Sequence, residues 1–201
     1  MNWILPRLWL FCVLTVAHAS PQIIEFESNG LRFQTLTHGG VTVMFAMMPS
    51  TLREYAIIQA AVANGSSTHC LVKPEDFTFV RPDGSEVRGA PPRQIVGMMV
   101  EKGSRSDVVK MVSAYEASIY GMSRIRSTNG YEQRRQAALA EVTSTRLKAA
   151  AAASAIVFVQ TRLNAGDSTD GALFFPNEGK PLGPGKLIVR NTAGVYEFPV
   201  E

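Results

Sequence analysis

The chain has 201 residues, of which 46% are hydrophobic and 18% charged, and its formal net charge is +3. This composition provides one sizeable core and argues against wholesale disorder. The net charge is too small for the electrostatic footprint of a nucleic-acid-binding protein, and two cysteines exclude a disulfide framework and a zinc site of the CxxC type.

Residues 1–19 have the parts of a secretory signal. Arg7 precedes an apolar run, Leu8–Val16, and Ala17–Ala19 supplies the small-x-small pattern that a signal peptidase needs. The run is about half the roughly 20 residues of a bilayer-spanning helix, so we expect cleavage rather than a membrane anchor. The sequence therefore predicts an exported protein, periplasmic or extracellular, with no transmembrane span in its mature form.

Cleavage near Ala19 would leave residues 20–201, which we expect to form a single domain. Cys12 lies inside the apolar run and would leave with the signal, so Cys70 would remain without a partner. We interpret Cys70 as a small buried residue on a strand, and we expect the fold to be held by its core rather than by a disulfide.

The first part of this mature chain has the pattern of an antiparallel β protein. Turn signals such as His38-Gly39-Gly40, Asn64-Gly65 and Asp83-Gly84 separate short apolar runs. Asn64-Gly65-Ser66 also matches a glycosylation sequon, although it serves equally well as a turn. Pro49-Ser50 is expected to end the second strand. The predicted strands cover residues 31–36, 41–47, 55–62, 68–72, 77–80 and 85–88.

The middle of the chain, about residues 104–154, has helical patterns instead. Ser106 or Asp107 is the expected cap of a first helix that ends at Gly121, and Asn129-Gly130-Tyr131-Glu132 resembles a capping box that begins a second helix through Ala153. The apolar stripe of the first helix has a 3.6-residue spacing and comprises Val108, Met111, Val112, Tyr115 and Ile119. Together these patterns predict an inserted αα-hairpin.

The last part of the chain returns to β patterns. The continuous apolar run 155–159 predicts a central strand, 172–175 predicts a strand that stops at Pro176, and 186–190 is expected to pair with 195–198. We therefore predict a mainly β protein (α+β by content). Its eight or nine strands should form an antiparallel β-sandwich around the helical insertion.

Two groups of segments carry a resemblance to known domains. The first comprises Ala60–Asn64, Lys73–Phe77 and Asp83-Gly84, and the second comprises Ala172–Pro176, Lys186–Val189 and Tyr196–Phe198. They are similar to the middle and the closing strands of small exported bacterial Ig-like β-sandwich domains of unknown function. The resemblance implies an Ig-like sandwich without catalytic residues, and the helical segment from Ser104 to Ser154 departs from it.

Catalytic patterns are scarce. The chain has no Gly-x-Ser-x-Gly elbow, and the mature part contains only His38 and His69. His69 and Cys70 are neighbours on a predicted strand and would point to opposite faces, so they do not form a simple nucleophile–base pair. We therefore predict that the protein is not an enzyme, and a hydrolase is kept only as a third alternative.

Methionine is frequent enough to raise copper handling as the first alternative, because thioether sulfur suits Cu(I). That function would require two or more of Met47, Met98, His38 and His69 to come within coordination distance. Core methionine that fills gaps between other side chains is the simpler interpretation. We therefore assign no metal and no cofactor.

The strongest functional signal is a cluster of positive charge. Seven lysines and arginines fall within residues 124–162, against Glu132 and Glu141. Such a region can be a solvated helix face, or a surface for an anionic partner. We predict a non-enzymatic binding or accessory module whose partner is an unknown protein, the cell wall or an anionic membrane surface, and not a nucleic acid. The candidate binding residues are Arg134, Arg135, Arg146 and Lys148.

Overall fold

The computed structural model describes residues 22–121, 136 and 144–201. Within this range the chain has mainly β structure in three antiparallel sheets, with three α-helices. The predicted fold class, an antiparallel sandwich-like β protein with a helical insertion, is therefore confirmed. The expected signal at 1–19 lies outside the described residues.

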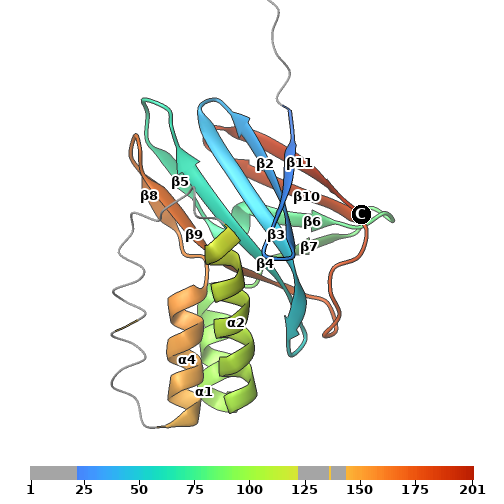
Figure 1. The fold of residues 1–201 in the computed structure, drawn as a ribbon, viewed down its shortest axis with the longest axis vertical. Coiled ribbons are helices and arrows are strands. Elements are labelled where there is room, and N and C mark those ends of the chain that lie inside the picture. The colour runs from blue at the N-terminus through green and yellow to red at the C-terminus, as the bar shows by residue number, and fades with distance from the viewer. Residues whose placement is uncertain (1–21, 122–135, 137–143) are drawn as a thin grey trace, which may run out of the picture.

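Two sheets form the body of the molecule (Figure 1). A short two-stranded sheet lies beside them and pairs β5 (Cys70–Val72) with β8 (Thr161–Leu163). The five-stranded sheet has the order β1 (Ile24–Ser28), β2 (Leu31–His38), β3 (Val41–Leu52), β4 (Tyr55–Asn64), β9 (Ser168–Pro176). The four-stranded sheet has the order β11 (Gly194–Val200), β10 (Gly185–Asn191), β6 (Phe77–Val80), β7 (Glu86–Arg88).

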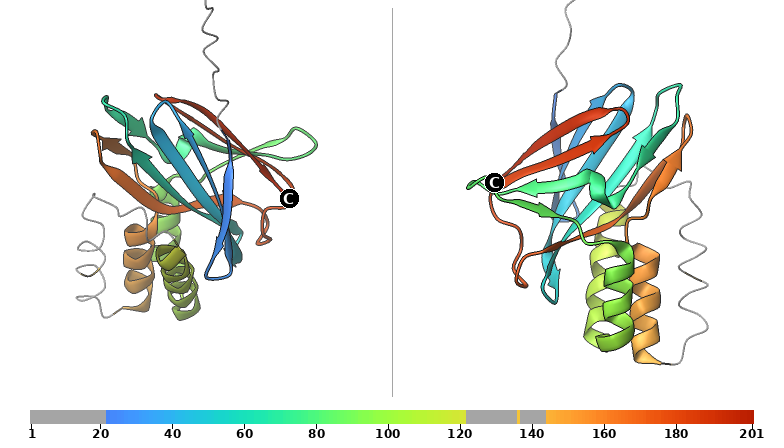
Figure 2. Two further views of the ribbon diagram at one scale, coloured as in Figure 1. Left: turned by 45° about the horizontal axis from the view of Figure 1, so that its top comes forward. Right: turned by 180° about the vertical axis from the view of Figure 1, so that it is seen from behind.

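Strands β4 and β9 of the five-stranded sheet are buried on both faces by different layers. Successive residues of a strand point to opposite faces, and β4 is apolar at nearly every position. Ile57 and Ala61 belong to a core on the helix side of the sheet, whereas Ile58 and Val62 belong to a core shared with the second sheet. The described molecule therefore has three layers, which are helices, the five-stranded sheet and the four-stranded sheet (Figure 2).

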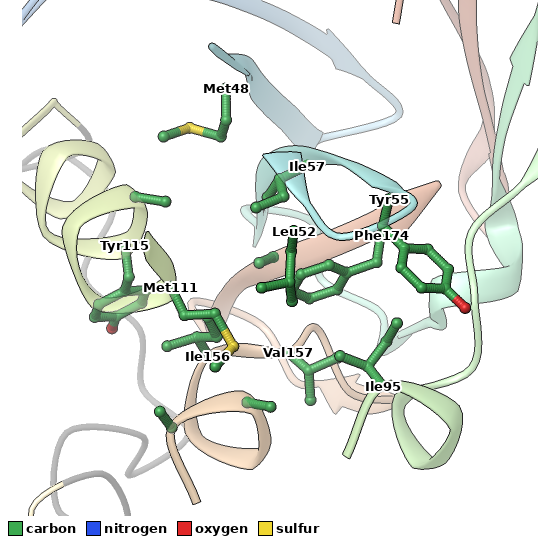
Figure 3. Close-up of a cluster of buried hydrophobic side chains, with 14 of the residues drawn as sticks. Met48, Leu52, Tyr55, Ile57, Ile95, Met111, Tyr115, Ile156, Val157 and Phe174 are labelled. Carbon is green, nitrogen blue, oxygen red and sulfur yellow. The ribbon is translucent and has the colours of Figure 1, made fainter. Parts of the chain in front are cut away.

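The core on the helix side joins the sheet to the helices (Figure 3). Ile57 and Phe174 come from β4 and β9, and they face Met111 and Ile156, which come from helices. Tyr115, on the same helix as Met111, is also buried. Met111 and Tyr115 confirm this part of the predicted apolar stripe, Val108 and Val112 are half-buried, and the side chain of Ile119 lies outside the described residues. Fully burying a side chain of this size stabilises a fold by roughly 1.5–3 kcal/mol.

The core between the two sheets is aromatic. The rings of Phe45 and Phe198 meet edge to face at 5.0 Å between centroids, and those of Phe77 and Phe158 meet at 5.3 Å. Tyr196 is fully buried, and its hydroxyl donates to the carbonyl oxygen of His38 at 3.1 Å. Burial raises the pKa of Tyr196 to about 12. Side chains of β11 therefore tie the four-stranded sheet to the β2–β3 hairpin.

The described helices differ in number and extent from the predicted pair. α1 (Pro92–Lys102) begins well before residue 104 and was not predicted, although a proline in the first turn is a typical start of a helix. α2 (Arg105–Gly121) follows after two residues. α4 (Thr145–Ile156) begins after Ser144, whose extended backbone (ψ 133°) interrupts the single helix expected to run through to Ala153.

Two expectations about strands were wrong. The apolar run 155–159 is not a strand, because Ala155 and Ile156 complete α4 and Val157 makes only an isolated bridge to Ala172. A buried helix end has the same apolar pattern as a buried strand. Pro49 does not end β3 either, because a bulge between Met47 and Thr51 accommodates a residue without an N–H group. β1 and β8 were not predicted.

The side chain of Asn64 is polar and only 1% exposed, and it forms hydrogen bonds with two neighbouring turns. Its Nδ2 donates to the carbonyl oxygens of Thr68 (2.7 Å), Leu163 (3.1 Å) and Asn164 (3.1 Å), and its Oδ1 accepts from the amide and the hydroxyl of Ser66. The Asn64 side chain therefore closes the turn after β4 and the turn after β8. A buried amide that makes these bonds leaves no room for a glycan, so the sequon is a structural turn in the folded chain.

We expect Asn64→Asp to lower the free energy of unfolding by about 2–4 kcal/mol, because a carboxylate would replace a donor that faces three carbonyl oxygens. Urea unfolding followed by circular dichroism measures this loss. Asn29→Asp, on an exposed turn, is the matched control and should change stability by less than about 0.5 kcal/mol. Equal stability of the two variants would contradict the role given to Asn64.

Candidate binding surface

The three described helices share one end that points away from the sheets (Figures 1 and 2). At the other end, the amide of Ala90, just before α1, donates to Phe174 in β9, and the amide of Phe158, just after α4, donates to Ala172 in β9. The end of α1 and the beginnings of α2 and α4 therefore lie together, opposite the helix ends that meet Phe174 and Ala172. We call this part, residues 100–110 and 144–148, the distal end.

The distal end is closely packed where α1 meets α4. Gly103 follows α1, and a Cβ atom placed on it would lie 2.6 Å from Cβ of Ala149, so only glycine fits there. Ala149 is fully buried at the second turn of α4. The alanine tract of α4 thus permits the close approach of the chain that follows α1.

A capping box holds the beginning of α2. The carboxylate of Asp107 accepts from the amide of Ser104 (2.8 Å) and from its hydroxyl (2.7 Å), while the amide of Asp107 donates back to the Ser104 hydroxyl (3.3 Å). Ser104 is therefore the cap, and Asp107 is the third residue of the helix. The prediction of Ser106 or Asp107 as the cap missed the true cap by two or three residues.

Arg53 links the distal end to the β-sheet. It lies at the tip of the β3–β4 hairpin with φ of 52°, and its Nη2 donates to Asp107 Oδ2 at 2.8 Å and to the carbonyl oxygen of Lys102. One guanidinium thus donates hydrogen bonds both to a free carbonyl oxygen at the end of α1 and to the carboxylate in the first turn of α2. This contact fixes the helices against the hairpin.

The charge of Asp107 is maintained in this setting. Burial alone would raise the pKa of its carboxyl group, but the hydrogen bonds from Ser104 and from the Arg53 guanidinium outweigh burial. The pKa of Asp107 therefore lies below its ordinary value, and the charged form stabilises the fold.

Basic side chains are exposed at the distal end on all three helices. The opposing acidic residues there are Glu101 and Asp107, and Asp107 is already paired with Arg53. The exposed basic residues are Lys102, Arg105, Lys110, Arg146 and Lys148. The distal end is therefore positively charged.

The predicted binding residues fall on this surface only in part. Arg146 and Lys148 are exposed in the first turn of α4, whereas Arg134 and Arg135 lie outside the described residues. Arg162 lies on β8, in the two-stranded sheet, so the basic run 124–162 is not one surface.

Sequence reasoning missed three basic residues of the distal end, Lys102, Arg105 and Lys110. They precede residue 124, where the counted charge cluster begins, and they belong to α1 and the start of α2. A prediction of α1 from its proline start would have placed Lys102 in its last turn. The packing of α1 on α4 could not have been read from the sequence.

Large apolar side chains are also exposed at the distal end. Val100 on α1 is 46% exposed, Val109 on α2 is 56% exposed and Leu147 on α4 is 51% exposed. Ile24 and Val195 are the other large hydrophobic residues that are strongly exposed in the described chain, and they lie on β1 and at the start of β11. Three of the five exposed apolar residues therefore belong to the helical distal end.

The candidate metal ligands are spread over different layers. Met47 packs on the core between the sheets, and Met98 packs on the core of the helix side. Met47 and its neighbour Met48 point to opposite faces of β3. His38 and His69 are exposed. Among the residues that the structure describes, no group of three or more His, Cys, Asp or Glu side chains is placed to hold a metal ion.

Cys70 lies in β5 and is buried, as the sequence predicted, and the Thr192 hydroxyl lies 3.6 Å from its sulfur. His69, the preceding residue, is exposed. The two side chains therefore do not form a local nucleophile–base pair.

Two hollows on the described surface contain charged residues in their lining. One, of about 730 Å³, lies beside the loop after β9, and hydrogen bonds from Ser85 lower the pKa of its Asp83 carboxyl group. The other, of about 430 Å³, lies at the open edge between the two sheets and contains Phe45 and Met47. Serine, threonine, cysteine and histidine are absent from the lining of both, so neither places a hydroxyl or thiol nucleophile beside a histidine base.

None of the helices in the described part of the chain has the length and apolarity needed to cross a membrane. In comparisons with protein-family models, curated proteins and solved structures, no match to this chain was found.

We expect Asp107→Asn to lower the free energy of unfolding by about 1–3 kcal/mol at pH 7, because the ion pair with Arg53 is lost. The pKa of Asp107 is lowered in the fold, so the stabilisation is complete above the ordinary pKa of a carboxyl group and is lost as pH falls through the folded pKa. The difference between the two proteins should therefore shrink as the pH is lowered from 7 to about 3 in urea unfolding experiments.

Glu197→Gln is the matched control, because its 3.8 Å pair with Lys186 lies on the exposed face of the four-stranded sheet. That variant should differ from the parent by less than about 0.5 kcal/mol at pH 7. A difference between Asp107→Asn and the parent that stays constant from pH 7 to pH 3 would refute the assignment.

Proposed function

We propose that the protein is an exported, non-enzymatic binding module that recognises an anionic surface through its helical insertion. In this proposal the mature chain begins near Ser20, and the sandwich belongs to the small Ig-like domains that its strand segments resemble. The sandwich serves as the rigid support, and the inserted helices make the contact.

One observation carries the proposal, namely the convergence of five exposed basic residues at the distal end. They come from α1, α2 and α4, and α4 begins more than 20 residues after α2 ends, yet the close approach of Gly103 to Ala149 brings these helix ends together. The carboxylate that could neutralise them most directly, Asp107, is occupied by Arg53. Positive charge concentrated in this way attracts polyanions and anionic surfaces.

The arrangement of the fold supports the same role. Functional residues often lie on segments added to a rigid scaffold. Here the helical layer is an insertion between β7 and β8, and it projects from the sandwich rather than covering the outer sheet. Among the described residues, the exposed basic side chains of the distal end are placed to meet a large flat partner.

The test is retention of the mature chain on anionic membrane and cell-wall fractions. We expect the fourfold variant Arg134→Gln, Arg135→Gln, Arg146→Gln, Lys148→Gln to lose retention at least tenfold, because each basic residue near an anionic surface contributes roughly 1 kcal/mol. Added salt should weaken binding of the parent protein in the same assay.

The control removes basic residues from the opposite part of the molecule. Lys186 and Arg190 are exposed on β10, away from the helices, and Lys186→Gln with Arg190→Gln should leave retention unchanged. Unchanged retention of the fourfold variant would refute the proposal.

A further inference from the structure

We propose that the anionic surface is a phospholipid bilayer, and that Val100, Val109 and Leu147 enter its interfacial region. The inference rests on the proposed function, because it specifies the partner of the same distal end. It predicts a protein that binds at the membrane surface without crossing the bilayer.

The first argument is the placement of apolar side chains. Val100 lies in the last turn of α1, Val109 in the second turn of α2 and Leu147 in the first turn of α4. Each exposes about half of its surface, although all three helices bury other apolar residues efficiently. These positions therefore keep apolar side chains exposed to solvent, although a lysine or glutamate there would make the protein more soluble.

The second argument is the order of charge around these residues. Arg146 and Lys148 flank Leu147 directly, and Lys110 follows Val109. A basic side chain next to an exposed aliphatic residue can keep its charge at the phosphate level while its methylene stem and its neighbour reach the acyl boundary. Glu101, next to Val100, is the exception.

The third argument is that the surface is already ordered. The capping box at Ser104, the ion pair of Arg53 and the contact of Gly103 with Ala149 fix the three helix ends relative to one another. Binding to a bilayer would therefore cost little ordering of this surface.

The chemistry separates a bilayer from a cell-wall polymer. A hydrated polyanion satisfies the basic residues but offers nothing apolar to three aliphatic side chains, whereas a phospholipid bilayer offers phosphate and hydrocarbon at adjacent depths. Charge alone would explain the proposed function, and the exposed aliphatic residues add the preference for lipid.

The test uses the mature chain from Ser20, which lacks the apolar run Leu8–Val16. Both tryptophans of the sequence, Trp3 and Trp9, fall in the expected signal, so Leu147→Trp would carry the only tryptophan of the mature chain. On vesicles of phosphatidylglycerol and phosphatidylcholine we expect its emission to shift to shorter wavelength and to be quenched by brominated acyl chains. Val195→Trp, at an equally exposed site on β11, should show neither effect.

A second variant tests affinity. The triple variant Val100→Ser, Val109→Ser, Leu147→Ser keeps all charges. We expect it to bind these vesicles at least about tenfold more weakly, because it lacks the exposed apolar surface that the parent would bury in the bilayer. Its retention on lipid-free cell-wall fractions should equal that of the parent. Ile24→Ser with Val195→Ser is the matched control and should bind vesicles like the parent.

The outcomes distinguish this inference from the proposed function. If Leu147→Trp binds vesicles without a spectral shift and the triple serine variant binds like the parent, insertion is refuted and binding through charge alone remains. If the fourfold glutamine variant of the basic residues also binds unchanged, the proposed function fails as well. Circular dichroism of each variant must match the parent, since all substituted sites in the described helices are exposed.

Discussion

Apolar packing on both faces of the five-stranded sheet holds the three layers together. β4 and β9 are central to this arrangement, because their alternate residues point into two different cores. Ile57 and Phe174 pack in the core with the helices, while Ile58 and Phe175 pack in the core with the second sheet. A strand in this position has no solvent-facing side, which explains why β4 is a continuous apolar run rather than an alternating one.

The position of the helices against the sheet depends on a few specific contacts, which the amino-acid composition does not reveal. At one end, Gly171 in β9 lets the chain after α4 pass close by, since a Cβ atom there would lie 2.6 Å from the Cα atom of Phe158. At the other end, Arg53 reaches from the β3–β4 hairpin to Asp107. The helical layer is therefore fixed to the sheet at both ends, and its distal surface is a defined shape rather than a mobile arm.

The proposed function depends on this rigidity. Exposed basic residues on a single helix are commonplace and contribute little by themselves. Here the ends of three helices present them together, with an aliphatic residue on each. In the proposal, the basic side chains complement the phosphate of a bilayer and the aliphatic side chains complement its hydrocarbon. Asp107 does not weaken the positive charge of the surface, because its carboxylate is paired with Arg53.

The sequence by itself determined the β-rich sandwich-like class, the presence of a helical insertion, and the buried state of Cys70 and Met111. These follow from local periodicity and turn residues, which act over a few positions. The tertiary structure alone decided that 155–159 ends a helix, because a buried helix end and a buried strand share one apolar pattern. It also decided that Lys102, Arg105 and Lys110 join Arg146 and Lys148, because that grouping depends on helix packing between residues more than 30 positions apart in the chain.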